Sequence, residues 1–260
     1  MLNWQQLQFD RVVGDLFGYH ALQVGLPHID TLRLNRMPHR WMACPNASDL
    51  QWWITRLPQG NAAPKPLSVL LAESVALPFA DQSLDLVALP NGLETSLDPH
   101  ATLREVERVL VPEGRLVISG LNPMSLWGLR QQRTQWLKRW GLGAEFVPDM
   151  GDWMGYWRLR DWLKLLSFQI ERGNFGIYRP AVNQQIWLQR WAWMDKAGER
   201  WWPILGAAYF LVAIKRVQGL RLLGAKWRRA AAVAVRQTST AKTRPVLTRR
   251  QVDEVVDEMR

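Results

Sequence analysis

The stretch LDLVALPNGLETSLDPHATLREVERVLVPEGRLVIS, residues 84–119, decides the fold of this chain. It holds two short apolar runs, at 84–89 and 115–119, each of the length of a buried strand. Between them a helix is predicted to begin at the N-cap Asp98, with Pro99 at its first position and apolar residues at helical spacing. Apolar strands joined by a helix are typical of a parallel sheet with helices on both faces.

Upstream of this stretch, the same kind of pattern continues. A buried strand is expected at 67–71 and another at 19–25. An amphipathic helix is predicted over 1–18, and a second helix over 28–39. The proline-containing run at 61–66 predicts a loop, and the rest of residues 40–66 shows no clear pattern.

Downstream, the pattern predicts a helix at 158–166 and strands at 168–175 and 207–215. Residues 122–157 form a long stretch that is rich in tryptophan and weakly patterned. Residues 217–260 have no clear core face and are expected to be a weakly ordered tail, with a short helix near 248–259.

The composition bounds the class of protein. The chain has 260 residues, of which 48% are hydrophobic and 22% charged, enough for one α/β domain at 1–216 with an appendage. Cys44 is the only cysteine, which excludes a disulfide scaffold and suits a reducing compartment, so a cytoplasmic location is expected. The longest apolar run has 12 residues, against about 20 for a membrane span, and the start lacks the pattern of a signal peptide.

The formal net charge of +10 is concentrated near the end of the chain. Residues 200–252 contain 12 Lys and Arg and no Asp or Glu, and the remainder has 21 basic and 23 acidic residues. A basic tail of this kind is either a solvated extension or an accessory contact with RNA or an anionic membrane surface.

Two segments around the central stretch resemble a known family. AESVALPFADQSLDLV (72–87) and LREVERVLVPEGRLVI (103–118) are similar to class I S-adenosylmethionine (SAM) methyltransferases of the type 11 group. NPMSLWGLR (122–130) looks like a poorly characterised proteobacterial branch of that group. The resemblance implies a Rossmann-like seven-stranded sheet, mostly parallel, with strand 207–215 antiparallel and helices on both faces.

The resemblance also implies a cofactor site. Glu73 would accept hydrogen bonds from the adenine amine of SAM, while Ser74 and Val75 would lie against the adenine ring. Pro90 and Asn91 would line the methionine and sulfonium end. Both groups follow strands at their carboxyl ends, where open α/β sheets bind ligands. The implied activity is methyl transfer from SAM to an unidentified small-molecule acceptor.

The loop after the first strand departs from the group's acid-x-Gly-x-Gly-x-Gly pattern. The aligned stretch is QVGLPHI at 23–29, in which Gln23 is neutral, Gly25 fits and Pro27 has no N–H to donate. Asp49 is the nearest candidate for the acid that binds the ribose. Two alternatives follow: SAM binds through altered contacts that include Gln23 and Gly25, or the chain is a non-catalytic Rossmann-like module that contacts RNA through its tail.

Other chemistries find little support in the sequence. The four histidines and Cys44 have no zinc-ligand spacing, so no metal site is predicted. There is no Walker loop, Gly-x-Gly-x-x-Gly or Gly-x-Ser-x-Gly motif. No catalytic base stands out, although Asn91 is placed to orient an acceptor and His100 is expected at the surface.

Tryptophan is the remaining clue to the acceptor. The chain has 16 tryptophans, 11 of them between residues 127 and 202. They indicate either an aromatic lid over a bulky hydrophobic acceptor, ordinary core packing, or a surface that lies on a membrane.

Overall fold

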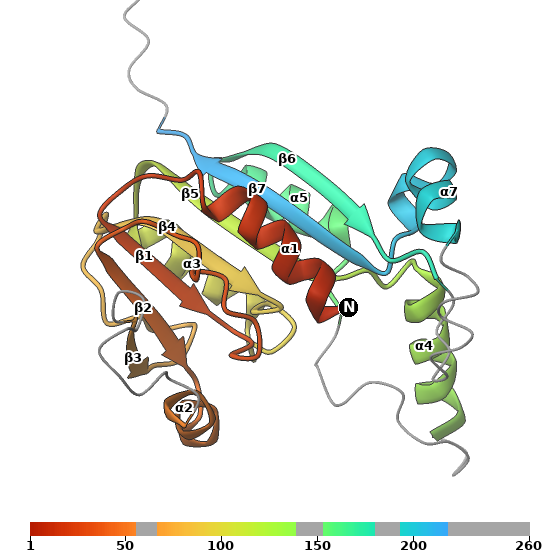
Figure 1. The fold of residues 1–260 in the computed structure, drawn as a ribbon, viewed down its shortest axis with the longest axis horizontal. Coiled ribbons are helices and arrows are strands. Elements are labelled where there is room, and N and C mark those ends of the chain that lie inside the picture. Colours follow the sequence, from red (N-terminus) through yellow and green to blue (C-terminus); the bar gives the residue numbers. More distant parts are fainter. Residues whose placement is uncertain (56–66, 139–152, 180–192, 218–260) are drawn as a thin grey trace, which may run out of the picture. The chain divides into compact units, whose positions relative to one another are not determined.

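A seven-stranded sheet forms the centre of the chain. The structure, a computed structural model, describes residues 1–55, 67–138, 153–179 and 193–217. In these residues the strand order is β3-β2-β1-β4-β5-β7-β6 (Figure 1). The strands are β1 (His20–Val24), β2 (His39–Cys44), β3 (Leu67–Leu71), β4 (Leu84–Pro90), β5 (Leu110–Leu121), β6 (Phe168–Gly176) and β7 (Ala208–Lys215).

The direction of the strands agrees with the expected topology. Strands β1 to β5 pair in parallel, whereas β7 is antiparallel to both of its neighbours, β5 and β6. The predicted mostly parallel sheet with an antiparallel strand at 207–215 is therefore confirmed. Because the order reverses between β1 and β4, the loops after these two strands lie at the topological switch point.

Helices cover both faces of the sheet (Figure 1). They are α1 (Leu2–Val13), α2 (Ala47–Ile54), α3 (Pro99–Val109), α4 (Leu126–Lys138), α5 (Tyr156–Leu165) and α7 (Trp193–Trp201), with a short 3-10 turn, η1 (Pro203–Leu205). On one face α1 buries Phe9 against Phe210 of β7, with ring centroids 5.1 Å apart. On the other face α3 and α5 contribute Leu103 and Leu159 to a second core cluster.

Helix α3 begins with the predicted N-cap and first-turn proline. The Asp98 carboxylate accepts hydrogen bonds from the backbone N–H groups of His100 and Ala101, both at 2.9 Å. Pro99 occupies the first turn, where its missing N–H costs nothing. The helix ends at Val109 and β5 begins at once, so the Pro-Glu-Gly stretch at 112–114 lies within the irregular start of the strand.

The predicted helix at 28–39 is wrong. These residues form turns, and β2 begins at His39. Side chains hold the segment in place of helical hydrogen bonds: Gln23 Nε2 donates to Ile29 O at 2.6 Å, and Asn35 Nδ2 donates to Val13 O at 2.9 Å. The apolar periodicity reflects burial of Ile29 and Leu32 against the sheet.

Other boundaries also differ from expectation. Helix α1 ends at Val13, short of the predicted residue 18. Strand β3 forms where predicted, but it is an edge strand and Leu71 is 58% exposed, so it is not fully buried. Strand β2 and helix α2 were not predicted. The loop at 61–66 and the tail beyond residue 217 lie outside the described residues.

The Asp98 cap gives a direct test of the helix register. We expect Asp98→Ala to lower the free energy of unfolding by about 1 kcal/mol, because two N–H groups of α3 lose their acceptor. Asp98→Asn keeps an acceptor oxygen and serves as the matched control. Urea denaturation measures both, and equal losses for the two variants would contradict the assignment of the cap.

Candidate functional site

Two adjoining hollows open at the carboxyl ends of β1, β2, β3 and β4. Their volumes are about 360 and about 260 Å³. They share five lining residues, contributed by the loops after β2 and β4: Pro45, Asn46, Thr95, Ser96 and Leu97. We therefore treat them as one site, the carboxyl-edge cleft.

Gly25 joins the two loops that border the cleft at the switch point. Its φ of +121° is rare for a residue with a side chain. A Cβ at this position would lie 2.7 Å from Pro90 O and 2.8 Å from the Cα of Gly92. The next residue, Leu26, donates its N–H to Pro90 O at 2.9 Å. Only glycine permits this approach of the β1 loop to the β4 loop, and Gly25 also lines the larger hollow.

The buried side chain of Gln23 holds the β1 loop through hydrogen bonds. Its Nε2 donates to Ile29 O at 2.6 Å and to Leu26 O at 3.4 Å, and its Oε1 accepts from the N–H and the hydroxyl of Thr31 at 2.9 and 2.6 Å. The side chain is buried and does not line either hollow. Gln23 was predicted to contact the cofactor, whereas in the structure its amide makes hydrogen bonds within the loop and lines neither hollow.

The residues after β3 line the smaller hollow, as a group. Glu73, Ser74 and Val75 all border it. Glu73 is exposed, and within the described residues its carboxylate has no hydrogen bond or ion pair. Ser74 Oγ lies 2.9 Å from Thr102 Oγ1 and 3.2 Å from Ser96 Oγ, so hydroxyl contacts fix the floor beside Glu73.

Asp49 lies in the first turn of α2, just after β2, and borders the larger hollow. The sequence had offered it as the nearest acid for a ribose. Asp49 thus borders the larger hollow and Glu73 borders the smaller one, so each hollow has an acidic residue in its lining.

Pro90 and Asn91 stand at the end of β4, but neither lines the cleft. Pro90 O accepts from the β1 loop, as described above. Asn91 is buried with a φ of +49°, and its Oδ1 accepts from Gln5 Nε2 of α1 at 2.8 Å. The structure therefore places the Asn91 amide against the N-terminal helix.

Glu94 is a site residue that the sequence analysis missed. It borders the larger hollow, is 2% exposed, and accepts the N–H of Leu121 at 2.9 Å through Oε1. Gly120 leaves room for Glu94 and for the Tyr209 hydroxyl beside it. Among the described residues, Glu94 Oε2 and the Tyr209 hydroxyl make no well-aligned hydrogen bond.

Burial raises the pKa of Glu94 to about 7, because the charged form loses its hydration, and the Leu121 N–H offsets only part of this. Burial and the neighbouring Glu94 carboxyl raise the pKa of Tyr209. No motif distinguishes Glu94 in the sequence, because its burial depends on β5 and β7, which are distant along the chain.

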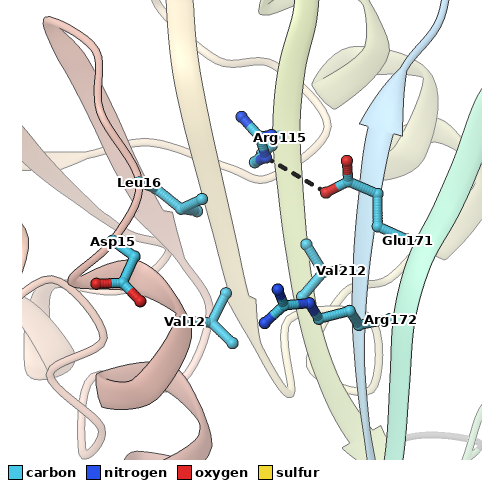
Figure 2. Close-up of a pocket in the computed structure, with 7 residues that line it drawn as sticks. All are labelled: Val12, Asp15, Leu16, Arg115, Glu171, Arg172 and Val212. Atoms are coloured by element: carbon cyan, nitrogen blue, oxygen red, sulfur yellow. Dashed lines mark hydrogen bonds and ion pairs between the residues drawn. The ribbon is translucent and has the colours of Figure 1, made fainter.

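A third hollow, of about 350 Å³, lies elsewhere on the sheet (Figure 2). Its lining residues come from the end of α1 and from β5, β6 and β7: Val12, Asp15, Leu16, Arg115, Glu171, Arg172 and Val212. Arg115 Nε lies 3.3 Å from Glu171 Oε2, so these two charged residues of the hollow form an ion pair. Since Arg115 is near the start of the parallel part of β5, this hollow lies toward the amino edge, away from the edge where such sheets bind ligands.

The tryptophans do not share one environment. Trp162 packs against the core cluster, as core packing predicts. Trp136, Trp157, Trp193, Trp201 and Trp202 are exposed. The predicted lid comprises Trp136, Trp140, Trp153, Trp157, Trp187, Trp191 and Trp193, and of these Trp140, Trp187 and Trp191 lie outside the described residues.

Comparison with known proteins connects this site to a family. Residues 49–118 match the methyltransferase domain family of type 11. An uncharacterised protein of Escherichia coli K12, YafS, is 40% identical over 99 residues, which are 38% of each chain. A demethylmenaquinone methyltransferase of Chlamydia pneumoniae is 39% identical over 67 residues, 26% of this chain and 27% of the relative. The chain thus matches less than two fifths of the length of these curated relatives.

The likeness extends further in structure than in sequence. A SAM-dependent methyltransferase of Thermotoga maritima superposes with a TM-score of 0.56 at 13% identity, covering 83% of this chain and 91% of the other. The sheet order and the switch-point cleft define a protein of the class I SAM-dependent methyltransferase fold. The match to the type 11 methyltransferase family covers residues 49–118, the part of the fold that holds the motifs at 72–87 and 103–118.

The raised pKa of Glu94 predicts a pH-dependent stability. The folded state keeps the proton up to about pH 7, whereas the unfolded carboxyl loses it near 4.5, so stability falls as the pH rises through this window. Over this whole pH window, Glu94 lowers the free energy of unfolding by roughly 3 kcal/mol. Glu94→Gln cannot titrate, so we expect its stability relative to the wild type to increase from pH 5 to pH 8.

Urea denaturation at both pH values measures this difference. Glu73→Gln, at an exposed carboxylate, controls for the loss of one negative charge. Parallel pH dependence of Glu94→Gln and the wild type would show that the Glu94 carboxyl is not held protonated by burial.

Proposed function

We propose that this chain transfers a methyl group from SAM to a hydrophobic or aromatic small-molecule acceptor. The observation that carries the proposal is the carboxyl-edge cleft, which joins Gly25 of the switch-point loop to a carboxylate in each hollow. The volumes of about 360 and about 260 Å³ together suit a ligand of nucleoside size. The type 11 match over residues 49–118 supports the same reading.

The lining residues fit the chemical groups of SAM. The exposed Glu73 carboxylate would accept hydrogen bonds from the adenine amine, with Ser74 and Val75 against the ring. Asp49 would accept hydrogen bonds from the ribose hydroxyls. Gly25, lacking a Cβ, would let the β1 loop lie close to the ligand.

The β1 loop makes this site depend on its carboxylates. The N–H of Leu26 is already bonded to Pro90 O, and Pro27 has no N–H. A loop with this sequence therefore offers fewer free amide donors than one with three glycines. We infer that Asp49 and Glu73 supply a larger share of the binding free energy than their counterparts in a glycine-rich site.

The reaction would require little acid–base chemistry from the protein. Bound SAM supplies an activated methyl group on a sulfonium, and the chain aligns the acceptor with it and excludes water. A general base is needed only for an acceptor that loses a proton. Pro90 and Asn91 would remain near the reacting end as positioning residues, because they fix the end of β4 to the β1 loop and to α1.

The acceptor class rests on two observations. Exposed tryptophans lie on α4 and α7, which follow β5 and precede β7. Several relatives that match part of the chain are named for methylation of quinones, among them the Chlamydia pneumoniae protein. Together these favour a hydrophobic or aromatic acceptor. The single, buried Cys44 suits a reducing compartment, so we place the activity in the cytoplasm.

Isothermal titration calorimetry with SAM and with its demethylated product tests the proposal. We expect both to bind the full chain, and Glu73→Ala and Asp49→Ala each to weaken binding by about tenfold through the loss of a charged acceptor. Asp161→Ala, at an exposed acid of α5, is the matched control and should bind as the wild type does.

Absence of heat with either ligand would contradict the proposal. It would favour the alternative, a Rossmann-like module without cofactor. Equal affinity for Glu73→Ala, Asp49→Ala and the control would show that SAM binds elsewhere.

A further inference from the structure

One face of α4 carries exposed apolar residues beside a cation. Leu126, Leu129 and Trp136 recur at helical spacing together with Arg133, so the four share a face of the helix. All four are exposed, Leu129 by 57%. A helix of a globular domain normally turns its apolar stripe to the core, whereas Leu126 and Leu129 are 50% and 57% exposed within the part of the chain that the structure describes.

A second exposed apolar group lies in the segment that leads into β7. Trp201 and Trp202, at the end of α7, are 71% and 59% exposed, and Ile204 of η1 is also exposed. We call the two groups together the apolar ridge. It consists of Leu126, Leu129, Trp136, Trp201, Trp202 and Ile204.

The sheet brings both halves of the ridge to the same edge. Leu121, the last residue of β5, pairs with Ala208, the first residue of β7, because the two strands are antiparallel. The side chain of Asn122 ties the halves together, donating to Ile204 O at 2.7 Å and to Gly206 O at 3.0 Å. This is the carboxyl edge, and Figure 1 shows α4 and α7 beyond it.

Positive charge accompanies the α4 half of the ridge. Residues 122–138 contain Arg130, Arg133 and Lys138 and no Asp or Glu. On α7, Asp195 and Glu199 balance Lys196 and Arg200, so this helix adds no net charge, and Asp195 is bonded to Arg179 Nε at 2.7 Å. Exposed Arg200 lies next to Trp201. Aliphatic and indole side chains among cations are the composition of surfaces that insert into the headgroup region of anionic bilayers.

We propose that the apolar ridge docks this protein on an anionic lipid surface. The aliphatic members favour lipid over nucleic acid, because Leu and Ile contact acyl chains well but offer no hydrogen bond or stacking to bases. Docking would bring the carboxyl edge, and with it the cleft, to a membrane in which a hydrophobic acceptor dissolves. Only that consequence rests on the proposed function.

Vesicle co-sedimentation of the full chain, without SAM, tests the docking. The vesicles are phosphatidylcholine alone and an equimolar mixture with phosphatidylglycerol. We expect the chain to pellet with the mixed vesicles, less at high salt and little with the neutral ones. No lipid-dependent pelleting at low salt would overturn the proposal, whatever calorimetry shows for SAM.

Matched variants assign the contact to the ridge. Leu129→Ser should lower partition into mixed vesicles about fivefold, as expected for one half-exposed leucine that enters the interface. Leu165→Ser should have no effect, since Leu165 is 79% exposed but lies on α5, just before the amino end of β6. Equal losses for the two leucines would contradict the proposal.

Charge variants separate lipid docking through the ridge from attraction by the basic tail. Arg133→Glu should lower the partition about tenfold, and Arg104→Glu, on α3, should leave it unchanged. Wild-type partition of Arg133→Glu and Leu129→Ser would transfer the contact to the tail and overturn the proposal. Loss of RNA retention by Leu129→Ser, with vesicle binding unchanged, would identify a nucleic-acid surface and would also overturn it.

Discussion

The close approach of the β1 loop to the β4 loop is the constraint on which the rest of the site depends. A Cβ at Gly25 would overlap Pro90 O, and a Cβ at Gly92 would lie 2.8 Å from Val24 O. Both loops therefore need glycine where they pass each other. The Leu26 N–H closes the contact by bonding Pro90 O. This junction fixes the switch point of the sheet and forms the border from which the cleft opens toward α2 and β3.

The same junction explains how the loop tolerates an unusual sequence. In the expected pattern, glycines let the backbone fold tightly and leave its amides free for the ligand. Here the Gln23 side chain makes hydrogen bonds to the backbone at Leu26, Ile29 and Thr31, so a buried amide organises the loop. A carboxylate at Gln23 could accept from Thr31 but could not donate to the two carbonyls. The loop therefore gains rigidity, and under the proposed function the ligand would find fewer donors there and would depend on the acids after β2 and β3.

Sequence patterns predicted those helices and strands that depend mainly on neighbouring residues along the chain. The cap at Asp98 and the apolar runs of β4 and β5 needed no distant information, and the motifs at 72–87 and 103–118 predicted the sheet. The helix expected at 28–39 failed because its backbone groups find partners in Gln23 and Asn35. Glu94 and the Gln5–Asn91 pair were missed because their burial arises from strands and helices that meet only in the fold. Of the residues assigned to the cofactor, Gly25, Glu73, Ser74 and Val75 line the cleft, whereas Gln23, Pro90 and Asn91 support it.

The carboxyl edge thus combines a cleft that suits a nucleoside with an apolar, cationic surface on neighbouring elements. Both features follow from one topology, because β1 to β5 end, and β7 begins, at this edge. The most direct measurement of the central claim is a crystal structure of the full chain with S-adenosylhomocysteine. The account predicts density in the cleft, with the adenine amine at Glu73 and the ribose at Asp49. A cleft without density, or a nucleoside bound in the hollow lined by Arg115 and Arg172, would contradict it.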